Sequence, residues 1–145
     1  MIRTEKEYQE ALERLAVDRQ FLEQQRERLQ ELGLHGDELA RAMHPALSFH
    51  DQLKEEVDTY EQIKRGDFEP LYNLTHIGRL LIGLRIARGL SQRELAERLG
   101  VSESVISRDE RNEYHGISVA RAQNILESLE VRFRLELEDP VLEAA

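Results

Sequence analysis

Apolar residues near the start of the chain recur at the spacing of a long, narrowly amphipathic helix. Thr4, followed three residues later by Glu7, forms a capping-box pattern that predicts a helix start at about Glu5, and Gly33 predicts its end. Such a helix is about 42 Å long, and its seven-residue stripe is narrow enough for one partner helix. The stripe consists of Tyr8, Leu15, Leu22 and Leu29. The partner is either a second copy of this helix or another part of the same chain.

A second helical region follows before a short linker. Asp37 is the candidate cap of a helix that runs through Met43, and Pro45 fits either the first turn of a new helix or a kink. A further helical stripe is formed by Leu53, Val57 and Tyr60. Gly66 predicts the end of this helix, and residues 67–70 form the linker.

The second half of the chain begins with two clearly delimited helices. Residues 74–88 carry apolar side chains at helical spacing and end at Gly89. Ser91 and Glu94 then form another capping box, which predicts the start of a short helix that ends at Gly100.

A third helix follows that short helix after a tight turn. Ser102 is its candidate cap, and Val105 and Ile106 are its inward-facing residues. Two short helices joined by a glycine turn are typical of a helix-turn-helix. Ala96 supplies the small residue where the two helices cross, and Gly100 supplies the left-handed residue of the turn.

One more amphipathic helix and a strand are predicted after this pair. Ser118 caps the helix, whose apolar residues are Ile117, Ala120, Ala122, Ile125, Leu126 and Leu129. Apolar residues then alternate with charged ones, which predicts a half-buried strand that Pro140 ends. These apolar residues are Val131, Phe133, Leu135 and Leu137. Because a lone strand must pair and the chain offers no other, we expect these residues to form the dimer contact with a second subunit.

The composition agrees with a mainly α fold. Among 145 residues only 6% are aromatic and none is Trp, whereas sheet proteins are rich in aromatic and β-branched residues. The absence of Cys excludes disulfides, thiolate zinc sites and cysteine nucleophiles. No apolar run is long enough to span a membrane, and residues 1–7 do not resemble a signal peptide. We therefore expect a soluble cytoplasmic protein without a membrane partner.

The sequence offers no catalytic or metal-binding pattern. The five His residues include no pair at i, i+4, and the chain contains neither HExxH nor GxSxG, nor a glycine-rich loop for phosphate or dinucleotide. Carboxylates are plentiful, but in helical runs they usually form a solvated face. We expect no enzymatic activity, no metal and no cofactor.

Charge divides the chain into three segments. Residues 1–70 hold ten basic and seventeen acidic side chains, residues 71–130 hold eight of each, and residues 131–145 hold two and four. Every basic residue after position 70 is Arg, whose planar donors suit phosphates and guanine edges. This predicts an acidic helical extension for dimerisation or partner binding (1–70), a helix-turn-helix domain (71–130), and a C-terminal strand and tail (131–145).

The stretch GLSQRELAERLGVSESVISRDERNEY, residues 89–114, resembles the Xre/Cro family of lambda-repressor-like DNA-binding domains. The resemblance covers about residues 74–130 and implies a helical DNA-binding bundle. Two positions depart from the family pattern. Asp109 stands where the family buries an apolar residue, which suggests a rotated or shorter third helix. Asn112 stands where the family commonly has Gly, and Asn is acceptable there because it can adopt the left-handed conformation.

The resemblance also implies which residues meet DNA. The third helix, from Ser102 to Arg111, would lie in the major groove with its N-terminal half against the bases. The expected DNA-binding residues are Ser91, Gln92, Arg93, Ser102, Glu103, Ser104, Ser107, Arg108 and Arg111. Glu103 either accepts a hydrogen bond from cytosine or stays out of the groove. Further candidates for neutralising phosphates are Arg79 and Arg85.

Three functions are compatible with these observations. The first is a homodimeric, sequence-specific repressor that is associated with the nucleoid and binds a palindromic operator. The second is suggested by residues 60–66, YEQIKRG, ahead of the DNA-binding domain, which resemble HigA-type antitoxins; such a protein would bind a basic toxin and regulate its own operon. The third is a scaffold with a degenerate DNA-binding domain. The operator, the regulated genes, any effector or toxin, and the segment that forms the dimer stay open.

Overall fold

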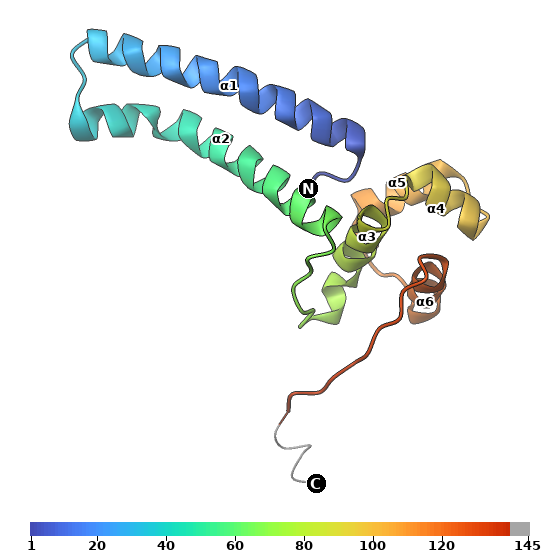
Figure 1. Ribbon diagram of the computed structural model, residues 1–145. Helices are drawn as coiled ribbons and strands as arrows, with labels where there is room; N and C mark the ends of the chain where they lie inside the picture. Colours follow the sequence, from blue (N-terminus) through green and yellow to red (C-terminus); the bar gives the residue numbers. More distant parts are fainter. Residues whose placement is uncertain (140–145) are drawn as a thin grey trace.

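The computed structural model describes residues 1–139, which form six α-helices and one 3₁₀ turn (Figure 1). The elements are α1 (Glu5–Glu31), α2 (Gly36–Lys64), η1 (Leu74–His76), α3 (Ile77–Ala87), α4 (Gln92–Leu99), α5 (Glu103–Arg111) and α6 (Val119–Ser128). The first two helices form a long antiparallel hairpin, and the last four form a small bundle at one end of it (Figure 1).

The hairpin shows which helix covers the apolar stripe of α1. This stripe packs on α2 of the same chain, and the buried side chains between the helices include Ala11, Leu22, Met43 and Val57. Gly33 turns the chain with a φ of +92°, a left-handed conformation that favours glycine. Packing on its own chain is thus confirmed for α1.

Helix α2 differs from its prediction at two points. It begins at Gly36 after His35, whose side chain makes no capping bond, and the expected cap Asp37 lies in the first turn. It also continues through Pro45 without a new start. Pro45 is exposed, so water can satisfy the carbonyl that loses its backbone donor. The stripe that includes Met43 and Val57 stays buried on both sides of the proline.

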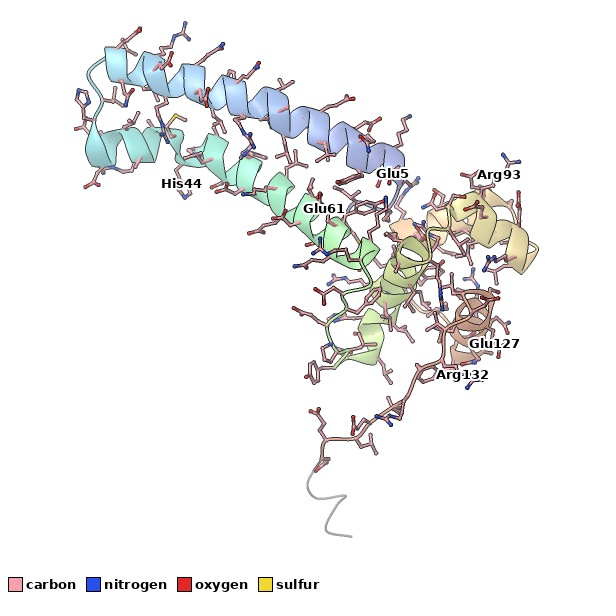
Figure 2. The ribbon with its side chains drawn as sticks, in the orientation of Figure 1. Glu5, His44, Glu61, Arg93, Glu127 and Arg132 are labelled. Carbon is pink, nitrogen blue, oxygen red and sulfur yellow. The ribbon has the colours of Figure 1, made fainter. Side chains whose placement is uncertain are left out.

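The end of the hairpin nearest the bundle is fixed by two stacked tyrosines. The rings of Tyr8 and Tyr60 lie 4.8 Å apart. The Tyr8 hydroxyl donates to Glu61 (2.7 Å) and the Tyr60 hydroxyl to Glu5 (3.1 Å), while Lys64 Nζ contacts the same Glu5 carboxylate at 2.9 Å. Glu5 and Glu61 both lie at this end (Figure 2). Burial, supported by the bond to Glu5, raises the pKa of Tyr60 to about 12.

The bundle agrees with the sequence-predicted helices. Ser91 and Glu94 form a complete capping box, Gly100 is left-handed at φ +70°, and Ser118 accepts a bond from the Arg121 amide at 3.1 Å. Helix α4 packs on α5 and α6, and α3 packs on the same two helices. The fully buried core side chains are Leu81, Ile82, Leu95, Ile106, Ile125 and Leu129.

Helix α3 carries two glycines at close approaches. A Cβ on Gly78 would lie 1.8 Å from the Glu113 carbonyl oxygen, and one on Gly83 would lie 2.8 Å from the Phe68 ring. Glu113 belongs to the loop between α5 and α6, where it and Tyr114 both have a φ of +52°. Asn112 has a φ of −89°, so the prediction of a left-handed Asn112 is wrong.

Hairpin and bundle share one hydrophobic core. Ile2, Val57 and Tyr60 belong to the same buried cluster as Leu81 and Ile106, and α2 packs on α3. The acidic extension is therefore packed against the helical bundle and fixed relative to it.

The predicted C-terminal β-strand is wrong. After α6 the described chain is extended and contains no strand through residue 139, and it runs away from the bundle (Figure 1). Phe133, Leu135 and Leu137 are each more than 60% exposed, and Val131 is half-buried. The alternating pattern is real, but the described chain offers no strand edge for pairing, so the ladder does not form. Pro140 lies outside the described residues.

Candidate nucleic-acid interface

Helices α4 and α5 cross at the tight turn that the sequence predicts. Leu95 and Ala96 of α4 and Ile106 of α5 are buried at their contact, whereas Val105 is half-buried. With Ile106 held inward, the opposite face of α5 points to solvent. The residues of that face decide what the domain can bind.

This exposed side of α5 carries hydroxyls and one guanidinium. Ser104, Ser107 and Arg108 lie at i, i+3 and i+4 and therefore share a face. Ser104 and Arg108 are exposed and Ser107 is half-buried. We call these three residues the reading face. Arg111 is exposed one turn beyond Arg108.

The N-terminal ends of both helices are polar but partly occupied. The Ser91 hydroxyl accepts from the Glu94 amide (3.1 Å) and the Ser91 amide donates to the Glu94 carboxylate (2.7 Å); the Ser91 backbone bond lowers the Glu94 pKa. Ser102 makes no capping bond, and its Oγ lies 2.9 Å from that of Ser104. Glu103 is exposed in the first turn of α5, where a carboxylate is favoured by the helix dipole.

The arginines of residues 71–130 separate into paired and unpaired side chains. Six of the eight contact an acceptor within the described chain: Arg79, Arg85, Arg88, Arg93, Arg98 and Arg121. Arg93, on the outer side of α4, pairs with Glu97 at 3.3 Å (Figure 2). Arg108 and Arg111 have no hydrogen-bond or ion-pair partner within residues 1–139. These two guanidinium groups are free to take an external anion or base.

One expected phosphate contact lies in the core instead. Arg85 is 3% exposed and Glu110 is fully buried, and the Arg85 guanidinium donates to both carboxylate oxygens, with Nη2 2.9 Å from Oε2. Gln92 also donates to Glu110 Oε2, at 2.7 Å, so part of its amide is used internally. Arg85 therefore cannot neutralise DNA. The signal in the sequence was its place beside Ile82 and Ile86 on an apolar face.

The unusual Asp109 is also explained by a partner. Its carboxylate forms an ion pair with Arg121, which ties α5 to α6, and this hydrogen bond raises the pKa of Arg121. Helix α5 keeps nine residues. An ion pair thus takes the place that an apolar contact would fill.

Comparison with known proteins agrees with this geometry. Residues 82–135 match a family model described as helix-turn-helix. This segment is similar to Xre/lambda-repressor-like helix-turn-helix domains. Comparisons with curated proteins and with solved structures give no match. The helix-turn-helix family is a DNA-binding, transcription-regulating family, and its model spans the second half of α3, all of α4 to α6 and the first part of the tail.

Two further properties of the described residues bear on the domain's chemistry. No group of three or more His, Asp or Glu side chains within residues 1–139 is placed to hold a metal ion. Among the same residues, no helix combines the length and the apolar character needed to cross a membrane. The helix-turn-helix family that the segment matches is a regulatory DNA-binding family and not an enzymatic one.

Proposed function

We propose that this protein is a sequence-specific transcription regulator, a repressor, that binds a palindromic operator as a homodimer. The observation that carries the proposal is the unpaired Arg108 on the reading face of α5, in a domain where other arginines are held by internal acceptors. A free guanidinium on the second helix of a helix-turn-helix can grip a guanine edge with two hydrogen bonds.

The remaining contacts follow from this placement. Ser104 and Ser107 lie beside Arg108 and reach either base edges or sugar-phosphate oxygens. Arg111 is exposed on α5 and Arg93 on α4, where they contact the DNA backbone. Glu103 stays at the rim of the groove or accepts from a cytosine amino group.

The subunit contact is a separate part of the proposal. Phe133, Leu135 and Leu137 are exposed apolar side chains of the tail, and burying them against a second copy would remove apolar surface from water. Deleting residues 131–145 should then convert a dimer to a monomer in light scattering. A dimer of unchanged mass would place the interface on the hairpin.

Selection of bound DNA from a random pool tests the main function. The full chain should enrich two inverted half-sites whose centres lie about one helical turn, or a multiple, apart. A pool that shows no enrichment over competitor DNA at physiological salt overturns the proposal. Enrichment of a single, unrepeated site would support sequence-specific DNA binding but would contradict the palindromic operator.

A second candidate function, that of an antitoxin, is favoured by the surface of the hairpin. Helices α1 and α2 hold fifteen acidic and eight basic side chains, and Val17, Phe21 and Phe49, all near the middle of their helices, are at least 58% exposed. An acidic surface with an apolar centre suits a basic protein partner.

This antitoxin function has a direct test. A short basic protein encoded next to this chain should co-purify with it and should be released when Phe21→Asp and Phe49→Asp are combined. Operator binding by that variant should be unchanged. Absence of any complex with the neighbouring protein would overturn the antitoxin function and leave the regulator function standing.

A further inference from the structure

The segment before α1 reaches into the helix-turn-helix domain. Ile2 is 6% exposed and belongs to the shared core. Arg3 Nη1 donates to the backbone carbonyl of Glu110 at 2.9 Å, and the Arg3 carbonyl accepts from Arg85 Nη2 at 2.8 Å. Two hydrogen bonds thus join the start of the hairpin to residues that stand 82 and 107 positions later in the chain.

Arg3 meets α5 at the end where a cation is favoured. The Glu110 carbonyl is among the last of α5, and these carbonyls carry the negative end of the helix dipole. The Arg3 amide in turn donates to Glu7 at 2.8 Å, and Thr4 caps α1 through the Glu7 amide. Arg3 therefore belongs to α1 on one side and to α5 on the other.

Three parts of the fold converge on Glu110 of α5. Its carboxylate takes donors from Arg85 of α3 and Gln92 of α4, and its carbonyl takes the donor from Arg3. These bonds fix the angle between α4 and α5. Arg108 stands two residues before Glu110, about 3 Å along the helix axis, so a tilt at Glu110 moves the reading face directly.

We propose that Arg3 is a positioning residue for DNA reading, which ties the orientation of α5 to the position of the hairpin. This inference rests on the proposed DNA-binding function. Its consequence is that a molecule bound to the hairpin that displaces the start of α1 weakens operator binding without touching DNA. Arg3 itself contacts neither base nor phosphate in this arrangement.

The test compares three substitutions of Arg3 with a matched control. Arg3→Ala removes the bond to α5, Arg3→Gln keeps a donor without the charge, and Arg3→Lys keeps the charge and a donor. Arg19→Ala removes an exposed arginine of α1 that has no partner among the described residues. Affinity for the selected operator is measured at a temperature where circular dichroism shows every variant to be folded.

We expect Arg3→Ala to bind the operator about fivefold more weakly, the size of one lost hydrogen bond. Arg3→Lys should recover most of this loss, and Arg19→Ala should match the parent. The base preference and the salt dependence should not change. Parental affinity in Arg3→Ala overturns the proposal. The proposal is also overturned if the slope of log affinity against log salt concentration becomes shallower by about two per dimer, because that would make Arg3 a phosphate contact.

Hydrogen exchange in the free protein gives a readout that does not depend on DNA. Amides in the last turn of α5 should exchange about fivefold faster in Arg3→Ala than in Arg19→Ala, while those of α6 stay unchanged. Equal rates in α5 overturn the inference. If Arg3→Ala does not fold, Arg3→Gln decides by the same comparison, because its shorter, uncharged side chain should also weaken the contact with α5 and raise the exchange rates there. Failure to select any DNA overturns the proposed function alone, since this exchange test is unaffected.

Discussion

Arg85 and Arg108 carry the same charge only 23 positions apart, but their surroundings give them opposite roles. Arg85 is buried and fully engaged by Glu110 and by backbone carbonyls, whereas Arg108 is exposed and has no acceptor within residues 1–139. A buried, paired guanidinium holds helices together, whereas an unpaired one on an exposed helix face is available to a ligand outside the chain.

Arg108→Ala should therefore lower operator affinity by about 1–3 kcal/mol and relax the preference at one base pair in each half-site. The measurement is binding to the operator and to operators altered one base pair at a time. Arg93→Ala is the control, because Arg93 is paired with Glu97 on an exposed face and should weaken all sequences slightly and alike. Uniform weakening by Arg108→Ala, or a lower melting temperature with preference intact, would remove Arg108 from the base-reading residues.

Glu110→Ala should reduce the free energy of unfolding by about 3–5 kcal/mol, because it leaves the Arg85 charge buried without its partner. Chemical denaturation measures this loss. Glu97→Ala removes an exposed partner of Arg93 and should cost less than about 1 kcal/mol. Comparable losses in the two variants would show that the buried pair contributes no more than the exposed one.

Residue roles in this site were only partly predictable. The reading face followed from spacing and from the family resemblance, since Ser104, Ser107 and Arg108 share a helix face. The Arg85–Glu110 pair was missed because its members are 25 positions apart and leave no local pattern. The contact of Arg3 with α5 was missed for the same reason, as periodicity says nothing about long-range pairing.

At the scale of the elements, the two glycines of α3 should differ in their tolerance to a methyl group. Gly78→Ala places Cβ 1.8 Å from the Glu113 carbonyl, which is backbone, whereas Gly83→Ala meets the Phe68 ring at 2.8 Å. A ring can rotate away more easily than a carbonyl in a loop with a φ of +52°. We expect Gly78→Ala to cost about 3 kcal/mol or more and Gly83→Ala about 1 kcal/mol, measured by thermal unfolding. The reverse order would show that α3 does not pack on this loop.

The hairpin should lose stability at high pH through Tyr60. The pKa of Tyr60 is raised from 10.0 to about 12 by burial, so its contribution is complete below pH 10 and is lost as pH rises toward 12. The free energy of unfolding should fall by about 1 kcal/mol between pH 9 and pH 11 from this group. Urea denaturation of the parent and of Tyr60→Phe measures it, with Tyr72→Phe as the control at an exposed site. Identical pH profiles for the parent and Tyr60→Phe would contradict this linkage.

Helix boundaries could be predicted from the sequence where they depend only on residues within the same helical turn. Capping residues and glycines marked the ends of α1, α4 and α6, because their effect lies within one helical turn. The continuity of α2 through Pro45 and the missing strand after α6 depend on what lies alongside. The residues next to Pro45 and Phe133 in the sequence do not show which parts of the fold pack beside them, so neither outcome could be predicted locally.

At the scale of the whole molecule, charge sets the orientation on DNA. The acidic hairpin projects from one end of a bundle whose residues 71–130 have no net charge (Figure 1). In the proposed complex phosphates would repel the hairpin, so we expect α5 to approach the groove with α1 and α2 pointing away from the duplex. That orientation leaves the hairpin accessible to a second protein while the operator is bound.

The same charge distribution limits how many phosphates the protein can neutralise. Within residues 71–130, only Arg108 and Arg111 are unpaired arginines, so a dimer should release few counterions from this part of the chain. We expect the slope of log affinity against log salt to be about −3.6 to −4.5, from about four or five neutralised phosphates. Arg111→Ala should make this slope shallower by about two per dimer, whereas Arg98→Ala should leave it unchanged because Arg98 donates to the Ser128 carbonyl. A parental slope steeper than about −8, or an effect of Arg98→Ala equal to that of Arg111→Ala, would mean that the paired arginines turn outward to DNA.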